Sequence, residues 1–261
     1  MIRLHQGGVT AVTILQSIAL LPPLGVVLMV EGAPQIALLF AAVIVALLWE
    51  GLFGFLRRRP ATAHGLTTAL IVAIVVPVGL PLWQLAVALS LGVILAELIF
   101  GGRGFGFLSA ATVSLSLLLF SFPQTVLRPV TADLALATLL GALLLLAFGL
   151  LSWRAAVGFI AALVALLALT GSPVDITATL VAVSVGLVFL VCDPFAAAST
   201  NPGRWLYGAL AGGLAVVFSA GAAAPPMAAL VSAALFASIT APLIDHLVIL
   251  ADAERRRRCL G

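Results

Sequence analysis

The feature that most constrains this chain is a series of apolar segments, each about as long as a lipid bilayer is thick. A helix needs about 20 largely apolar residues to cross the hydrocarbon core of a membrane. Ten segments approach that length, separated by short linkers that contain Pro or Gly. They cover roughly residues 12–30, 34–56, 64–80, 82–100, 106–123, 133–152, 155–171, 174–192, 205–221 and 226–248. The sequence therefore predicts an all-α, polytopic membrane protein with about ten transmembrane helices.

Composition supports this class and excludes several others. Of 261 residues, 64% are hydrophobic and only 8% are charged, whereas a soluble domain carries roughly 25% charged residues. The deficit argues against a soluble enzyme, a disordered chain and a nucleic-acid-binding protein. Two cysteines, Cys192 and Cys259, are too few for a disulfide framework. The three histidines lie far apart in sequence and have no metal-ligand spacing, so we expect no metal site.

The arginines predict how the chain is oriented. All 12 basic residues are arginine. With ten spans, both termini face one side, and so do all arginines except Arg128. The positive-inside rule makes that side cytoplasmic, which predicts a multi-pass protein of the bacterial inner membrane with both termini in the cytoplasm. The run Arg255–Arg258 is interpreted as an orientation signal that contacts anionic lipid, or alternatively as a docking patch for a partner subunit.

A faint internal repeat divides the chain into two halves. Residues 65–83 and 175–205 each hold a Thr-containing apolar stretch that leads to two prolines and a tryptophan. The matching positions are Pro77, Pro81 and Trp83 in the first stretch and Pro194, Pro202 and Trp205 in the second. With ten spans the two turns face opposite sides of the membrane, as a five-plus-five inverted repeat requires. We expect one membrane domain, 1–261, with half-repeats 1–123 and 133–248 and a basic cytoplasmic tail, 249–261.

Four acidic residues fall in or beside apolar segments, where an ionised group is costly. Glu50 and Glu97 lie near arginines of the following loops, so we interpret them as interfacial carboxylates paired with those arginines. A place on an ion pathway is the alternative for both. Asp245 is expected to close the last helix near its cytoplasmic end.

Asp193 is the strongest candidate for a functional side chain. Pro194 follows it directly, and a proline frees backbone carbonyls that can bind a cation or a polar ligand. Thr200 and Asn201 add side-chain oxygens a few residues later. A salt bridge between Asp193 and Arg204 across the turn is the structural alternative.

The same region carries a resemblance to a known family. The stretch CDPFAAASTNPGRWLYGALAGG (192–213) is similar to the signature of the RnfD and NqrB membrane subunits of Rnf and sodium-pumping NADH:quinone reductase complexes. Cys192 replaces a family threonine. Segments 81–111, 120–123, 150–154 and 241–245 also resemble the family and follow in its order. The residues that match the signature are Asp193, Pro194, Thr200, Asn201, Gly203, Arg204, Tyr207 and Gly208.

The chain departs from the family pattern at three places. Gly106, Ser109 and Ala110 stand where the family's glycine loop has Asn, Asn and Pro. Thr62-Ala63-His64 replaces a polar Asp-x-Ser entry to the third span. The family's covalent-FMN motif, Ser-Gly-Ala-Thr, is missing from segment 123–133. Covalent FMN is therefore not expected, although Thr125, Thr131 and Thr138 are the threonines that a divergent attachment would use.

The resemblance implies an integral membrane subunit of an RnfD/NqrB-like electron-transfer complex coupled to ion translocation. Such a subunit has other membrane subunits and flavin or iron–sulfur subunits as partners, and we expect an accessory role without catalytic residues of its own. The candidate binding residues are Asp193, Thr200, Asn201 and Arg204, for an ion, a quinone or a non-covalent flavin such as riboflavin or FMN. The alternatives are a stand-alone permease for a small solute and a structural membrane anchor for redox partners.

Overall fold

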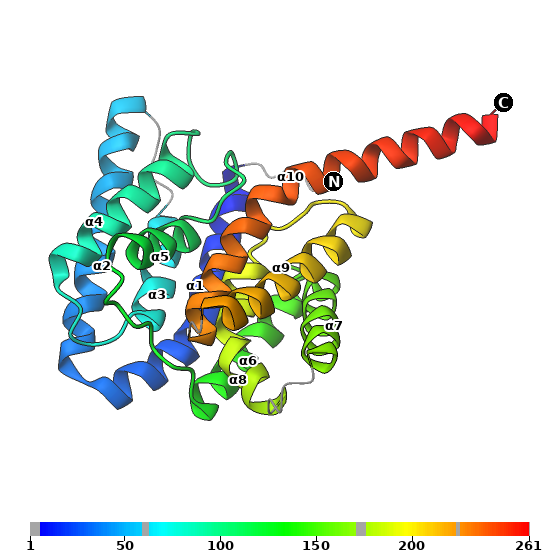
Figure 1. Ribbon diagram of the computed structural model, residues 1–261. Coiled ribbons are helices and arrows are strands. Elements are labelled where there is room, and N and C mark those ends of the chain that lie inside the picture. The colour runs from blue at the N-terminus through cyan, green and yellow to red at the C-terminus, as the bar shows by residue number, and fades with distance from the viewer. Residues whose placement is uncertain (1–5, 59–62, 171–175, 223–224, 261) are drawn as a thin grey trace.

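The chain folds into helices in the order that its apolar segments predict. The computed structural model describes residues 6–58, 63–170, 176–222 and 225–260, which form ten α-helices and no strand (Figure 1). Two of the helices continue into π-helical turns, α4 into η1 and α8 into η2. The elements are α1 (Gln6–Glu31), α2 (Ala33–Arg57), α3 (Gly65–Val75), α4 (Leu82–Val93), η1 (Ile94–Leu98), α5 (Ala110–Ser121), α6 (Ala132–Ala147), α7 (Trp153–Leu169), α8 (Ile176–Gly186), η2 (Leu187–Val191), α9 (Asn201–Ala222) and α10 (Pro226–Leu260).

The all-helical prediction is thus confirmed, whereas the prediction of ten spans stays a prediction. Among the described residues, three stretches are long and apolar enough to cross a membrane: Thr10–Glu31, Ala33–Arg57 and Pro226–Arg255. Six further apolar helices are shorter. Helix α3 ends at Val75, well before the expected end of its segment, because Pro77 cannot continue the backbone hydrogen bonding of a helix.

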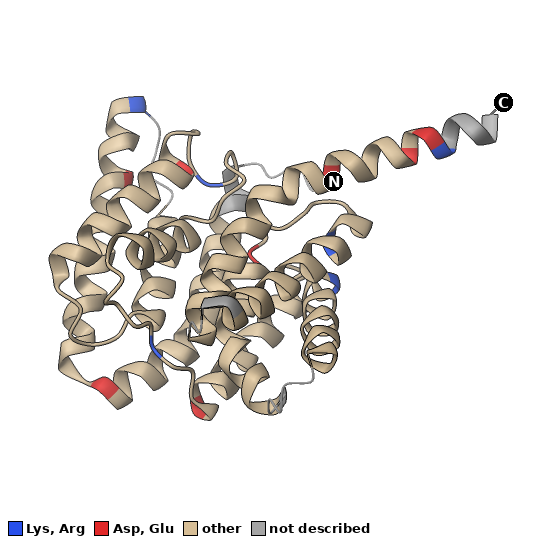
Figure 2. Cartoon of the chain, in the orientation of Figure 1, with Lys and Arg blue, Asp and Glu red and all other residues tan. Residues whose placement is uncertain are grey.

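The last helix is much longer than its apolar segment. Helix α10 runs through the predicted tail as far as Leu260, so that its second half projects away from the body (Figure 1). Figure 2 shows that most of the ribbon carries no charged residue and that charges recur near the free end of α10.

The helices pack as two groups joined in the middle. Figure 1 shows α2–α5 on one side of the body and α6–α9 on the other, with α1 and the first part of α10 between them. Within the groups, α2 packs on α3 and α4, α4 on α5, α7 on α9, and α9 on α10. Contacts of α1 with α6 and of α5 with α10 join the two groups.

Glycines bring the backbones of α7 and α9 unusually close together. A Cβ atom on Gly208 would lie 2.1 Å from the carbonyl oxygen of Ala155, and one on Gly212 would lie 2.3 Å from that of Phe159. Gly158 faces Trp205 in the same way, at 2.7 Å. Small residues that allow such an approach are typical of helix pairs in membranes, where burial of apolar surface drives association little.

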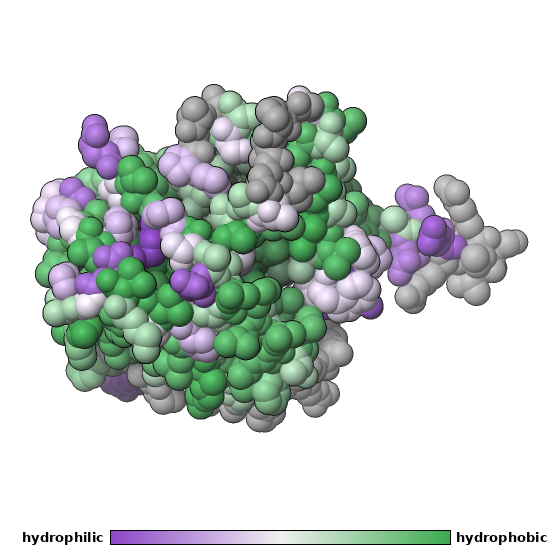
Figure 3. All heavy atoms as spheres, turned by 90° about the horizontal axis from the view of Figure 1, so that it is seen from below, coloured by the Kyte–Doolittle hydropathy of each residue, from purple (hydrophilic) through white to green (hydrophobic). Residues whose placement is uncertain are grey.

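Much of the outer surface is apolar. Phe40, Ile44 and Leu48 on α2 and Leu139 and Leu143 on α6 are all more than half exposed. Figure 3 shows that apolar side chains cover much of the face seen from below, with hydrophilic side chains more frequent toward one side of the body and on the projecting end. An exposed apolar surface of this extent suits contact with lipid rather than water.

Candidate functional site

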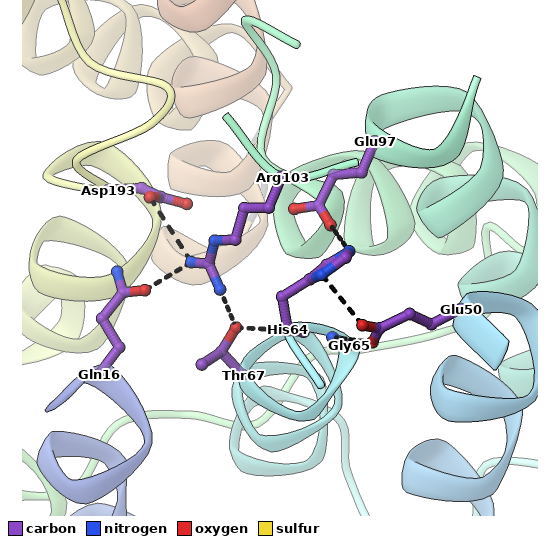
Figure 4. Close-up of polar contacts among 8 residues, drawn as sticks. All are labelled: Gln16, Glu50, His64, Gly65, Thr67, Glu97, Arg103 and Asp193. Carbon is purple, nitrogen blue, oxygen red and sulfur yellow. Dashed lines mark hydrogen bonds and ion pairs between the residues drawn. The ribbon is translucent and has the colours of Figure 1, made fainter. Parts of the chain in front are cut away.

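Three ionisable side chains meet at the start of α3, inside the group formed by α2–α5. The imidazole of His64, the residue before α3, lies between Glu50 of α2 and Glu97 of η1 (Figure 4). Its Nδ1 is 3.2 Å from Oε1 of Glu50, and its Nε2 is 3.3 Å from Oε2 of Glu97. All three residues are at most 6% exposed. We call these residues the Glu–His–Glu triad.

A buried arginine stands beside the triad. Arg103 comes from the glycine loop between η1 and α5, and its guanidinium donates hydrogen bonds to Oγ1 of Thr67 and Oε1 of Gln16 (Figure 4). It lies 4.0 Å from Oδ1 of Asp193 and stacks over the ring of Phe195, 4.7 Å from the ring centroid. Arg103 therefore links α1, α3 and the segment after η2, three parts of the chain that are far apart in sequence.

Local backbone features place these side chains. Glu97 lies within the π turn η1, and Asp193 follows the π turn η2 by two residues. Such turns are rare and frequently occur at functional sites. Between η1 and Arg103, Gly101 and Gly102 have φ angles of 118° and 111°, which residues with a Cβ atom rarely adopt. The glycine loop can therefore fold back and direct Arg103 inward.

Helix α3 is held at its N-terminal end by groups of the site. Oε2 of Glu50 accepts a hydrogen bond of 3.0 Å from the backbone N–H of Gly65, the first residue of α3. A carboxylate at this end is favourable because the N-terminus of a helix carries partial positive charge and free N–H groups. Glu50 thus anchors both the helix and the imidazole of His64.

The other end of α3 is held by Arg128. Its backbone N–H donates to the carbonyl of Val75, and its Nε and Nη2 donate to the carbonyls of Ile74 and Val76, each at 3.1 Å. A cation is favourable where free carbonyls end a helix. Arg128 is only 8% exposed and also binds Glu31 and Gln35.

Of the predicted site residues, only Asp193 reaches this cluster. Its Oδ1 faces Arg103 and also accepts a hydrogen bond of 3.1 Å from the N–H of Phe195. Arg204 donates instead to the carbonyl of Ala198, at 3.2 Å. The alternative of an Asp193–Arg204 salt bridge was wrong, since the partner of Asp193 comes from the glycine loop.

Thr200 and Asn201 are directed elsewhere. Thr200 donates through its backbone N–H, at 3.0 Å, and its hydroxyl, at 2.5 Å, to Oδ1 of Asp245. The other oxygen of Asp245 accepts two hydrogen bonds from Ser199. Asn201 accepts one from Arg154, at the surface. The structure therefore does not bring the four predicted residues into one pocket.

Two interpretations of single acids are corrected by these contacts. Asp245 does not close the last helix, because α10 continues beyond it and its carboxylate instead fixes the loop before α9. Glu50 and Glu97 are buried and contact His64, so they are not interfacial carboxylates. Of the loop arginines, Arg59 lies outside the described residues and Arg57 binds the carbonyl of Ile99, whereas Arg103 is buried in the site and acts electrostatically on Glu97.

Sequence reasoning missed His64, Arg103 and Gln16 as members of the site. The one available signal was His64 itself, which stands where the related family has a polar entry to the third span. Arg103 and Gln16 are 87 residues apart, and no spacing rule connects them.

The cluster holds more acid than base. It contains the carboxyl groups of Glu50, Glu97 and Asp193, the guanidinium of Arg103, and the imidazole of His64. Buried charges are expensive unless they are paired or bind something. If all three carboxyl groups are ionised, the cluster carries an excess negative charge even with His64 protonated, a composition that can attract protons or cations.

Comparison with known proteins decides the family. The model of the NQR2, RnfD, RnfE family matches residues 5–134 and 128–253. The chain belongs to this family. Its relatives include proteins whose names describe a component of the Na(+)-translocating NADH-quinone reductase. Those of Stutzerimonas stutzeri (strain A1501) and Ectopseudomonas mendocina (strain ymp) are 27% identical over 283 residues, and that of Pseudomonas aeruginosa (strain LESB58) is 28% identical over 284. Each alignment covers 87% of this chain and 70% of the relative.

Membership confirms the resemblance that the 192–213 signature indicated. Family membership also accounts for the apolar surface, since it indicates that this chain is a membrane protein. The identity is low, so residue roles have to be argued from this chain's own contacts.

Proposed function

We propose that this chain is an integral membrane subunit of an ion-translocating redox complex of the NADH–quinone reductase kind. The observation that carries the proposal is the family match over nearly the whole chain, to relatives whose names state both sodium translocation and quinone reduction. The buried ionisable cluster is the second support, because moving an ion through an apolar protein requires such groups. In this role the chain acts within a complex and has no catalytic residues of its own.

The cluster is the part of the chain that we assign to the ion pathway. Glu97 faces His64 from the π turn η1, Asp193 faces Arg103 from the segment that follows η2, and Glu50 completes the site from α2. Five groups from separate segments have been brought together in the interior, at a cost that apolar residues would avoid. A purely structural anchor needs no such arrangement.

For topology, we propose ten spans in the bacterial inner membrane, with both termini in the cytoplasm. The ten helices in order and the biased distribution of arginine support this arrangement. The inverted repeat is supported by corresponding packing pairs: α2 on α4 and α4 on α5 in one half, α7 on α9 and α9 on α10 in the other. Helix α3, with 11 residues, is roughly 16 Å long, as expected of a discontinuous helix in such a repeat.

For the cofactor, we propose that no FMN is covalently attached and that any flavin is bound non-covalently. The reason is that the Ser-Gly-Ala-Thr motif is missing. Two threonines in and after the corresponding segment make other contacts: Thr131 caps α6 through its hydroxyl, and Thr138 is fully buried and donates a hydrogen bond to the carbonyl of Leu134. We expect flavin or iron–sulfur subunits and further membrane subunits as partners.

The deciding experiment is purification of the full chain from its own membranes in a mild detergent. We expect flavin- or iron–sulfur-containing subunits to co-purify and the visible spectrum to show their cofactors. After denaturation, this chain's gel band should show no flavin fluorescence. Isolation of the chain alone, with no redox partner, would favour the stand-alone permease instead.

Asp193→Asn tests the role of the cluster within the complex. We expect normal assembly but a clear loss of ion-coupled activity, because the amide keeps the shape of the side chain and removes its charge beside Arg103. The matched control is Asp133→Asn, at an exposed aspartate of α6. Wild-type activity in a fully assembled Asp193→Asn complex would remove this residue from the pathway.

Reporter fusions test the topology. A reporter after the C-terminus and one inserted in the 124–131 segment should report opposite sides of the membrane, with the C-terminus in the cytoplasm. Matching signals at the two positions would rule out the ten-span arrangement.

A further inference from the structure

The contacts of His64 constrain how many protons the Glu–His–Glu triad holds. Both ring nitrogens lie within 3.3 Å of a carboxylate oxygen. A neutral imidazole carries one N–H and one lone pair. If both carboxylates were ionised, that lone pair would face a negative oxygen at close range. A second proton, either on the ring or on one of the two carboxyl groups, would remove this repulsion.

The surroundings favour keeping this second proton. Four groups around the imidazole determine the local charge: the triad's own Glu50 from α2 and Glu97 from η1, Asp193 from the segment after η2, and Arg103 from the glycine loop. Three of them are carboxyl groups and one is a cation, so the local field is negative. With the second proton the triad carries one negative charge, which Arg103 can balance. Without it the triad carries two.

The geometry also argues against a metal cation between the two glutamates. The imidazole itself occupies the space between Glu50 and Glu97 (Figure 4). The second oxygen of Glu50 is engaged by the N–H of Gly65, and the side-chain oxygens of Gln16 and Thr67 are turned toward Arg103. Three of the oxygens that a hard cation could use as ligands, those of Glu50, Thr67 and Gln16, are thus already bound to N–H donors.

We propose that Glu50, His64 and Glu97 form a proton-binding site that holds two protons in the arrangement shown here and exchanges one of them with water. In this chain the imidazole ring occupies the space that a metal cation would need. Release of the second proton leaves a lone pair opposite a carboxylate, so the triad opens at one of its two contacts. All three residues come from this chain, so this proposal does not depend on whether the chain works in a redox complex.

Selective labelling of the full-length chain in lipid nanodiscs tests this proposal directly. The chain has three histidines and four glutamates, so ¹⁵N-histidine and ¹³C-carboxyl-glutamate signals can be assigned with single His→Gln and Glu→Gln variants. The ring and carboxyl signals would be followed between about pH 5 and pH 8, the range over which histidine charge changes matter most. Each series would be recorded in sodium chloride and in choline chloride.

In the wild-type protein we expect two protons on the triad over part of this range, seen as a doubly protonated His64 ring or as one protonated carboxyl group. Glu97→Gln should remove one of them and leave His64 neutral at the same pH, because one carboxylate no longer requires a proton. The control Glu254→Gln, at an exposed position of α10, should leave the His64 signals unchanged. Exchange of choline for sodium should leave all triad signals unchanged.

Two results would overturn the proposal. One is a neutral His64 ring with both Glu50 and Glu97 ionised throughout the range. The other is a sodium-dependent shift of the triad signals at constant pH, with that of Glu254 unchanged, because this would place a metal cation on the carboxylates. Both results come from the wild-type protein, so the test does not depend on any variant folding.

Discussion

The two halves of this protein are held together by different kinds of contact. In the first half, α1–α5, charged side chains are buried between the helices. In the second half, α6–α10, helices meet through bare backbone at glycine. Among the residues that the structure describes, every buried charged side chain lies outside the helices α6–α10 themselves. Three of the close glycine contacts of the second half join α7 to α9, although Gly92 makes a similar contact with Ser114 between α4 and α5.

The difference indicates that the first half provides most of the ionisable groups, whereas the second half is mainly a packed helical scaffold. Glycine contacts need no polar partner or balancing charge nearby, so they suit a scaffold in lipid. Buried ionisable groups are costly and are retained for function. The second half contributes Asp193 to the cluster. It also contains a polar clasp, the hydrogen bonds of Asp245 with Ser199 and Thr200, which is partly open to solvent.

Arg103→Leu should have the largest effect on stability. It leaves Asp193 and the triad without their balancing charge, and breaking a buried pair costs about 3–5 kcal/mol. We expect a severe loss of monodisperse protein on heating in detergent. Arg154→Gln, at a surface arginine bound to Asn201, is the matched control and should change stability by no more than about 0.5 kcal/mol. Equal losses in the two variants would mean that burial of charge does not distinguish the halves.

Gly208→Ala should be next in size. Its Cβ would lie 2.1 Å from the carbonyl oxygen of Ala155, so α7 and α9 must move apart, and overpacking of this kind costs about 1–3 kcal/mol. Gly25→Ala in α1 meets nothing within 4 Å and should be neutral or stabilising by up to about 1 kcal/mol, as expected of alanine in a helix. Heat stability of both variants in detergent checks the expectation, which fails if Gly208→Ala is tolerated as well as Gly25→Ala.

Asp245→Ala should have the smallest effect of the three. It removes the acceptor for Ser199 and Thr200, but the site is partly exposed and water can replace the carboxylate, so we expect a loss of about 1 kcal/mol. The local readout is faster proteolytic cleavage between Pro194 and Thr200. Asp133→Asn, at an exposed position, should leave the cleavage rate unchanged. An unchanged rate in Asp245→Ala as well would show that the clasp does not order the loop.

The helices could be predicted from sequence far better than the cluster. Long apolar segments separated by Pro and Gly determine where helices run, and all ten occur in order. Ends were less accurate where a charged segment simply continues a helix, as α10 does as far as Leu260. Helix geometry is local, so a sequence window contains most of what decides it.

The cluster depends on contacts that no window contains. Arg103 looked like a surface residue because it follows two glycines in a loop between apolar segments. In fact the left-handed conformation of Gly101 and Gly102 turns the loop inward. Asp193 could be identified because a proline and a family signature mark it. The place of His64 at the entry to the third span was visible, but its pairing with Glu50 and Glu97 was not, since these two acids come from helices before and after it in the chain.

Because of the π turn η1, deletion of a single residue in this part of the chain would change the direction in which Glu97 points. A π turn holds an extra residue compared with an α-helical turn, so in-frame loss of the codon for Leu95 or Ala96 would leave an ordinary α-helix. Each residue of an α-helix turns by about 100°, so the acid at position 97 would be swung away from the ring that it now contacts. A deletion that looks harmless at the level of helix formation would thus separate the two ends of the triad, whereas conservative substitutions around it would not.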